Sequence, residues 1–270
     1  KIESLGHNYR ELEIAPDHNN DFKLDANALH IWPRGGFMCI ALPNTEKTFT
    51  VTLFLPAQGE TSFAAIQSSA EARVFFEKYF PDALNLVEDF DNDWRKNPES
   101  SLSTLYLNTW HYQDSIVLLG DAAHAMVPFH GQGMNCAFED CLAMVEAIDQ
   151  QADWPDAIAA FEAARMDNAA AIQAMALENY VEMRDKVDDA QFLLQRTLER
   201  QLAGLYPERF VPRYSMVSFQ RVDYATAFTR GKIQRQILQT LTEGKSDTNA
   251  VDFVRASELI HQQLEPLRYD

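Results

Sequence analysis

The chain has 270 residues, of which 46% are hydrophobic and 23% charged, a composition typical of a folded globular protein and not of a disordered one. Its formal net charge of −17 disfavours nucleic acids and anionic membrane surfaces as partners, because like charges repel. Cys39, Cys136 and Cys141 form neither a disulfide framework nor a Cys-x-x-Cys cluster, which predicts reduced thiols in a cytoplasmic protein without a bound metal. No stretch is apolar enough for a membrane-spanning helix.

The first 60 residues predict strands. Residues 28–33, 37–43 and 48–56 are rich in β-forming residues, and a four-residue turn signal joins the last two. This arrangement is typical of an antiparallel meander. In the third segment apolar residues alternate with threonines, which indicates one buried face made of Phe49, Val51, Leu53 and Leu55.

Two helices are expected next. The first covers residues 69–80, presents Val74, Phe75 and Tyr79 as its apolar side chains, and is ended by Pro81. The second is a short helix over residues 84–94.

The segment from residue 115 to residue 140 predicts a strand, a glycine-containing loop and a helix. In residues 115–119, SIVLL, the last four residues are all apolar, which is typical of a strand buried in a sheet. The helix is expected over residues 134–150, with an apolar stripe of 3.6-residue period made of Met134, Phe138, Cys141, Leu142, Val145 and Ile148.

This segment is suited to bringing backbone close to a ligand. Gly120 allows a tight exit from the strand, and Asp121 places an acceptor at the strand's carboxyl end, where ligands bind in α/β folds. Gly131 and Gly133 remove side chains so that main-chain N–H groups can approach an acceptor at the positive end of the helix. An ordinary strand–loop–helix connection would carry the same pattern. The string GQGMNC half-matches Gly-x-Gly-x-x-Gly, but it does not follow a strand and is rejected as a dinucleotide fingerprint.

Neighbouring polar residues are given structural interpretations. His124 is expected to be structural, and Glu139 and Asp140 are interpreted as favourable charge near a helix start.

From residue 156 onward the pattern is almost entirely helical. Helices are expected to about residue 187, then over residues 189–205, and twice more after residue 218 with a break near Gly244. The sequence thus predicts three segments: mainly antiparallel sheet over residues 1–110, the strand–loop–helix over residues 111–152, and a helical region over residues 153–270.

The string GDAAH, followed by Pro-x-x-Gly-x-Gly-x-Asn, resembles the second FAD motif of the FAD-dependent aromatic hydroxylases, the p-hydroxybenzoate hydroxylase-like class. The resemblance implies a mixed α+β and α/β fold, with a substrate-domain antiparallel sheet, the FAD-motif strand–loop–helix and a C-terminal helical region. It implies that Asp121 hydrogen-bonds the ribityl chain of FAD and that the loop lines the isoalloxazine. The cofactor-binding residues so implied are Gly120, Asp121, Pro128, Gly131, Gln132, Gly133, Met134 and Asn135.

Within that family the chain resembles the kynurenine 3-monooxygenases, through the strings HIWPR, IALPN, TLFLP, PFHGQGMN, FEDC, ENYVEMRDKV and RYSMVSF. This implies hydroxylation of the small aromatic substrate L-kynurenine at C3, using NADPH and O₂ through a C4a-hydroperoxyflavin, with no catalytic residue from the protein. The substrate-binding residues it implies are Phe129, His130, Asn179, Met183 and Tyr214. The alternatives to a substrate role are ordinary structural ones. Met183 would fill the core, Tyr214 would be a partly buried packing residue, and Asn179 would be solvated.

The sequence departs from the family by lacking a Gly-x-Gly-x-x-Gly unit and the internal Asp-Gly motif. It is therefore expected to correspond to the C-terminal portion of such an enzyme, and not to hold FAD tightly or turn over by itself. Two alternatives stay open: a related hydroxylase acting on another aromatic acid, and a non-catalytic helical interaction module derived from this fold.

Overall fold

The computed structural model describes residues 1–185 and 189–267. These residues divide into two compact units, and each is described by itself. The sheet unit holds residues 2–104 with residues 180–185, and the helical unit holds residue 1, residues 105–179 and residues 189–267. The division into three segments that the sequence predicts, over residues 1–110, 111–152 and 153–270, stays a prediction.

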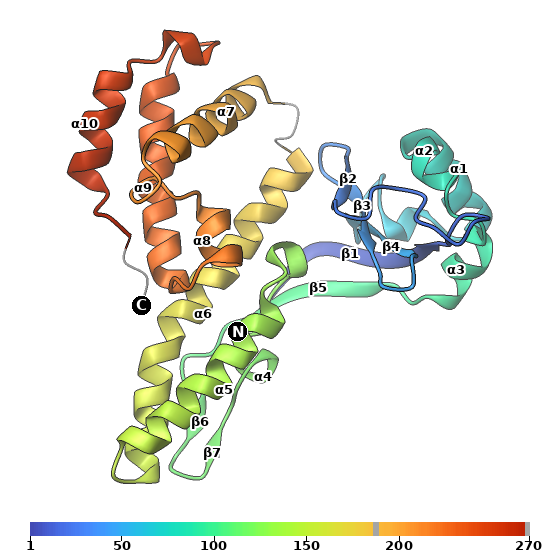
Figure 1. The fold of residues 1–270 in the computed structure, drawn as a ribbon. Coiled ribbons are helices and arrows are strands. Elements are labelled where there is room, and N and C mark those ends of the chain that lie inside the picture. Colours follow the sequence, from blue (N-terminus) through green and yellow to red (C-terminus); the bar gives the residue numbers. More distant parts are fainter. Residues whose placement is uncertain (186–188, 268–270) are drawn as a thin grey trace. The chain divides into compact units, whose positions relative to one another are not determined.

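The sheet unit is built on a five-stranded sheet of order β2-β3-β4-β1-β5 (Figure 1). Its strands are β1 (Ile2–Ile14), β2 (His30–Pro33), β3 (Met38–Pro43), β4 (Phe49–Pro56) and β5 (Ser100–Leu105). The predicted meander is confirmed, since β2, β3 and β4 pair antiparallel in sequence order. β1 inserts beside β4, with Leu12 opposite Val51. Most residues of β1 are polar or partly exposed, so the sequence gives it a weak strand signal.

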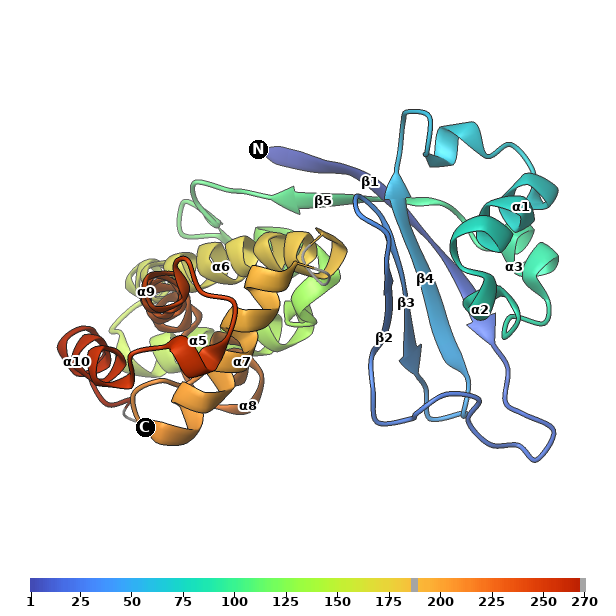
Figure 2. The same cartoon turned by 90° about the horizontal axis from the view of Figure 1, so that it is seen from above.

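The alternation in β4 predicted its core face correctly, because Phe49, Val51, Leu53 and Leu55 are all fully buried. They pack against α1 (Ser69–Tyr79), α2 (Pro81–Leu84) and α3 (Phe90–Lys96), which cover one face of the sheet (Figure 2). The opposite face of β4 is buried too: Phe54 is 3% exposed and packs on Tyr9 of the neighbouring strand. Because most residues of β4 are buried whichever face they are on, the alternation of its sequence identified only the more apolar of the two faces.

The helix expected over residues 69–80 is confirmed as α1, which begins after its Ser68 cap. Of its apolar side chains, Phe76 is buried, Phe75 and Tyr79 are partly buried against the core, and Val74 is exposed. The single helix expected over residues 84–94 is wrong. Pro81 starts α2, where its fixed φ suits a first helical position, and the chain turns again before α3.

The helical unit confirms the main predictions for the C-terminal half. Its long helices are α5 (Gly133–Gln150), α6 (Trp154–Asp185), α7 (Ala190–Leu205), α9 (Tyr224–Thr242) and α10 (Phe253–Gln263). Asp189 caps α7, and the break near Gly244 is present, with φ +66° at that glycine. The predicted end of the long helix near residue 187 lies outside the described residues. The short helix α8 (Arg213–Phe219), which follows Pro212, was not predicted. None of the helices described is long and apolar enough to cross a membrane.

The strand expected over residues 115–119 is not buried in a sheet, and that prediction is wrong. Within this segment only β7 (Ile116–Val117) is a strand. It pairs with β6 (His111–Tyr112) in a hairpin whose two strands have two residues each (Figure 1). Ile116 is 53% exposed. Within the described part of the chain β7 pairs with β6 alone, and a two-stranded hairpin does not enclose its apolar side chains.

The apolar stripe of α5 exists, but the helix does not bury it. Its members are exposed, from 44% at Ile148 to 69% at Met134. The opposite stripe is buried instead, and consists of Cys136, Asp140, Met144 and Ala147. Met144 and Ala147 pack with Phe161 of α6. Because α5 carries apolar residues on two faces, periodicity could not decide which face meets α6.

This orientation predicts a small effect on stability for glutamine on one face of α5 and a larger effect on the other face. Leu142→Gln is expected to change the free energy of unfolding of this chain by less than about 0.5 kcal/mol, because Leu142 is 61% exposed. Met144→Gln should cost about 1–3 kcal/mol, since it buries an amide among apolar side chains. Urea denaturation of both variants checks the orientation, which is wrong if Leu142→Gln is the more destabilising.

Candidate functional site

The turn after β7 requires glycine. Gly120 has φ +58°, and a Cβ added there would lie 3.0 Å from Cβ of Ala137 in α5. Both the left-handed backbone and this close approach disfavour any larger residue. The turn leads directly into α4 (Asp121–His124), so Asp121 stands at the first position of that short helix.

Asp121 lies beside the N-terminus of α5. A Cβ added to Gly133, the first residue of α5, would lie 3.9 Å from Oδ1 of Asp121. The N-cap residue Gln132 makes no side-chain capping bond to the first turn of α5. Asp121 is exposed, so a ligand there would meet a carboxylate acceptor and main-chain N–H donors at the positive end of a helix. This combination fits a ligand that carries both hydroxyl groups and polar acceptors.

The residues that the sequence predicted for the cofactor gather around this point. The loop between α4 and α5 contains η2 (Pro128–His130), followed by Gly131 in the left-handed region with φ +67°. The exposed members of the set are Asp121, Pro128, Gly131, Met134 and Asn135, while Gly133 is partly exposed. These residues are therefore accessible to a ligand.

Gln132 is placed differently. It is 7% exposed, and its Oε1 accepts hydrogen bonds from Nδ2 of Asn135 (3.0 Å) and from the hydroxyl of Tyr224 in α9 (3.1 Å). Its side chain thus connects the loop to α9, and its carbonyl oxygen accepts from the N–H of Cys136 (2.9 Å), so a predicted cofactor contact would fall to its main-chain N–H.

A buried hydrogen-bond network lies behind the Gly120 turn. Asp140 of α5 is fully buried and accepts from the N–H of Gly120 (2.9 Å), from Nε2 of His124 (2.6 Å) and from Nε of Arg165 (2.8 Å). Burial raises the pKa of Asp140, but the hydrogen bonds from His124, Arg165 and Gly120 outweigh it and leave that pKa below its usual value. His124 also packs on Trp110, with ring centroids 5.0 Å apart.

This network revises the interpretation of Asp140, which is a central acceptor and not simply a charge near a helix start. Arg165 of α6 also donates to Glu139 (2.9 Å) and was not singled out from the sequence. The available signal was the position of Asp140 four residues after Cys136, on the face of α5 opposite the obvious apolar stripe.

Part of the network has the spacing of a metal site. Ligand atoms of His124, Cys136 and Asp140 lie within 4.8 Å of one another. However, the guanidinium of Arg165 donates to Asp140 and approaches Sγ of Cys136 at 3.5 Å, so a cation already lies beside both groups. Burial raises the pKa of the Cys136 thiol to about 12, which keeps it protonated. The cluster is better explained as a hydrogen-bond network than as a set of metal ligands.

Four of the five predicted substrate residues lie together in the helical unit. Phe129 and His130 are buried residues of η2. Nδ2 of Asn179 in α6 donates to the carbonyl oxygen of Phe129 (2.5 Å). The ring of Tyr214 in α8 stacks on His130, with centroids 5.5 Å apart and an interplanar angle of 18°. Met183 lies one turn beyond Asn179 on α6, in the part of the helix that belongs to the sheet unit.

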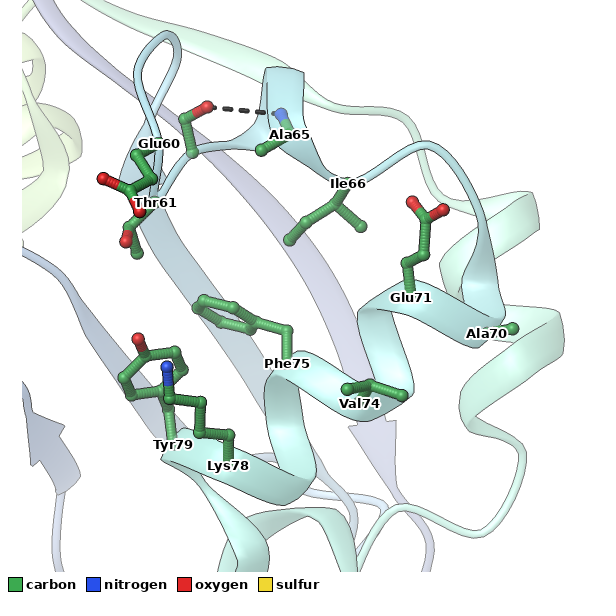
Figure 3. Close-up of a pocket in the computed structure, with 11 residues that line it drawn as sticks. Glu60, Thr61, Ala65, Ile66, Ala70, Glu71, Val74, Phe75, Lys78 and Tyr79 are labelled. Atoms are coloured by element: carbon green, nitrogen blue, oxygen red, sulfur yellow. Dashed lines mark hydrogen bonds between the residues drawn. The ribbon is translucent and has the colours of Figure 1, made fainter.

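The sheet unit contains an open groove of about 560 Å³ beside α1. Phe75, Lys78 and Tyr79 of α1 line it opposite Glu60 and Thr61 (Figure 3). None of the residues predicted for cofactor or substrate lines this groove. The candidate site is therefore the Asp121–α5 region and the neighbouring cluster of Phe129, His130, Asn179 and Tyr214.

A family model described as FAD binding domain matches residues 38–174, just over half of the chain. The chain therefore belongs to the FAD binding domain family. Solved structures agree on the fold. HpxO of Klebsiella pneumoniae, complexed with FAD and uric acid, matches with a TM-score of 0.55 and 16% identity over 76% of this chain and 50% of that one. The tetrameric form of 2-methyl-3-hydroxypyridine-5-carboxylic acid oxygenase matches with a TM-score of 0.55 and 19% identity over 69% of this chain and 50% of that one. The predicted fold class is confirmed.

Curated relatives are much more similar in sequence. The kynurenine 3-monooxygenase of Xanthomonas campestris pv. campestris (strain B100) is 57% identical over 266 residues, which cover 98% of this chain and 58% of that protein. The protein of the same name from Xanthomonas axonopodis pv. citri (strain 306) is 55% identical over 267 residues, covering 99% of this chain and 59% of the relative. The chain thus spans somewhat less than three fifths of the length of these relatives.

Proposed function

We propose that this chain forms the isoalloxazine side of the FAD site in a flavoprotein monooxygenase. The observation that carries the proposal is the approach of Asp121 to the N-terminus of α5, which offers an acceptor and main-chain donors at one place. Asp121 would accept from the ribityl hydroxyls, and the N–H groups of Met134 and Asn135 would face the pyrimidine edge. When bound, FAD supplies the redox and oxygen-transfer chemistry.

The reaction we propose for the whole enzyme is hydroxylation of L-kynurenine at C3 with NADPH and O₂, in the cytoplasm. The 57% identity to a named kynurenine 3-monooxygenase supports this substrate. The chain's own residues would bind and orient it. Asn179 offers a side-chain amide, and the rings of Phe129, His130 and Tyr214 offer apolar surface that excludes water from an aromatic ligand. We propose no protein nucleophile, because the aniline nitrogen of the substrate already activates its ring.

The exposed apolar stripe of α5, which runs from Met134 to Ile148, is a surface that another polypeptide segment could cover. Contiguous exposed apolar surface commonly marks an interface. The relatives extend beyond the matched region. We propose that in those relatives the remaining polypeptide covers this stripe and contributes further contacts to FAD.

An FAD titration followed by flavin absorbance and fluorescence tests the cofactor proposal. The chain by itself is expected to retain much less than one FAD per molecule, since it would supply only part of the site. Addition in trans of the part of the Xanthomonas campestris relative that lies outside the match should raise the bound fraction. Near-stoichiometric FAD on the chain alone would contradict the expectation of a partial site.

We call the chain together with the added part of the Xanthomonas campestris relative the complemented protein. Analysis of the products that it forms tests the proposed substrate. L-Kynurenine, NADPH and O₂ are expected to give 3-hydroxykynurenine. Oxidation of NADPH with no 3-hydroxykynurenine, while another aromatic acid is hydroxylated, would replace the proposed substrate but keep the proposed class of reaction. FAD-independent binding of a protein partner without any turnover would instead favour an interaction module.

A further inference from the structure

Two residues of the substrate cluster are each preceded in the chain by a charged residue, and these two charges meet. Glu178 precedes Asn179 on α6, and Arg213 precedes Tyr214 on α8. Nη1 of Arg213 donates to Oε2 of Glu178. The ion pair therefore joins the two backbone segments that carry Asn179 and Tyr214.

A third helix completes this arrangement. Nη2 of Arg235 in α9 donates to the same oxygen of Glu178 at 2.7 Å. Burial raises the pKa of Glu178, but the hydrogen bonds from Arg213 and Arg235 outweigh it and lower that pKa below its usual value. Glu178 is thus held ionised between two guanidinium groups from different helices.

Gly231 of α9 makes room for the aliphatic part of Arg213. A Cβ added to Gly231 would lie 2.5 Å from Cδ of Arg213, 3.0 Å from its Cγ and 3.1 Å from its Cβ. Glycine inside a helix is less favourable than alanine, so a close contact of this kind gives the residue a reason to be there. Arg213 is accordingly fixed at its head by Glu178 and along its stem by α9.

We propose that Glu178, Arg213, Arg235 and Gly231 form a positioning frame that fixes Asn179 and Tyr214 for an aromatic substrate; this rests on the proposed function. Consecutive residues of a helix point about 100° apart, so the frame lies to one side of the two residues it positions. Asn179 and Tyr214 each contact η2, through Phe129 and His130 respectively. A shift of α8 relative to α6 would therefore carry Tyr214 away from His130 and change its position relative to Asn179. The frame residues act through Asn179 and Tyr214 and are not catalytic themselves.

Amide hydrogen exchange tests the frame without any ligand. Glu178→Gln removes the charge that the two arginines share, and Gly231→Ala pushes Arg213 aside while leaving every charge in place. In both variants exchange over residues 213–219 is expected to accelerate roughly tenfold. Gly204→Ala is the matched control, because Gly204 lies in α7 with nothing within 4 Å of an added Cβ, and it should leave that exchange unchanged. Exchange within twofold of the parent chain in both variants would overturn the frame.

L-Kynurenine titration of the FAD-loaded, complemented protein separates positioning from general stability. Glu178→Gln is expected to weaken L-kynurenine binding roughly tenfold while the FAD content stays near that of the parent and the variant remains folded at the temperature of the titration. Unchanged binding alongside faster exchange would show that the frame does not serve the substrate. If the parent itself fails to bind L-kynurenine, the proposed substrate is overturned, and the exchange measurement still decides whether the frame holds α8.

Discussion

Replacing Asp140 by alanine is expected to destabilise the helical unit by about 3–5 kcal/mol. The substitution removes the shared acceptor of Gly120, His124 and Arg165, and it leaves the Arg165 guanidinium, 7% exposed, without its buried counter-charge. A buried charge that loses its partner carries an uncompensated desolvation cost. Chemical denaturation by urea, followed by circular dichroism, measures the loss.

Three further variants show whether the cost comes from the unpaired charge. Glu139→Gln removes the more exposed partner of Arg165 and should cost no more than about 1 kcal/mol. The double variant Asp140→Leu/Arg165→Met removes both charges and is expected to be less destabilised than Asp140→Leu alone. If the double variant is the less stable of the two, the network stabilises the fold by a route other than charge compensation.

The contribution of Asp140 should also depend on pH. Its folded-state pKa lies below the value of about 3.9 for an unperturbed aspartate, so the carboxylate stabilises the fold fully above that value. The stabilisation is lost as pH falls through the folded-state pKa. The stability difference between the parent chain and Asp140→Asn should therefore shrink below about pH 4. A difference that grows on acidification would contradict the assigned ionisation.

Replacing Asp121 by alanine is expected to weaken FAD binding roughly 10- to 100-fold in the complemented protein. The proposed bond from a ribityl hydroxyl to the Asp121 carboxylate is charge-assisted, and such bonds contribute about 1.5–3 kcal/mol. Asp121 is exposed and no hydrogen bond to its side chain is found among the described residues, so the substitution should barely change the unfolding free energy. Fluorescence titration with FAD measures the affinity.

Asp149→Ala provides a matched control for that experiment. Asp149 is likewise an exposed aspartate, but it lies at the far end of α5 from Gly133. Its replacement should leave FAD affinity within about twofold. Equal losses for the two variants would point to the overall negative charge, and would remove the specific role proposed for Asp121.

The sequence predicted the strands β2, β3 and β4 and the long helices of the C-terminal half because their signals are local. Alternating β-formers, capping residues and prolines act within a few residues of one another, as Asp189 does at the start of α7. The sequence pattern gave a wrong or incomplete prediction where a helix has two apolar faces, or where one segment is compatible with either one helix or two short ones. α5 carries apolar side chains on both faces, and residues 84–94 could satisfy one helix or two short ones.

The candidate site divides in the same way. The residues of the GDAAH loop are consecutive, so the sequence alone revealed their motif. The tight turn expected at Gly120 is present, with a positive φ at that residue. The role of Asp140 could not be predicted from the sequence. Its partners Gly120, His124 and Arg165 lie 16 to 25 positions away in the chain. The pairing of Glu178 with Arg213 and Arg235 spans 35 and 57 positions.

By itself, the sequence determined that this chain carries a meander, a glycine-bearing loop before a helix, and a helical C-terminal half, and its motifs predicted the flavin hydroxylase class. Only the tertiary structure decided that α5 turns its polar and sulfur-bearing stripe inward toward Arg165 and leaves its most apolar stripe exposed. The reason is that a helix's local pattern specifies which residues share a face. Which face is buried depends on the charge and volume that another helix presents to it, as Arg165 and Phe161 of α6 do here.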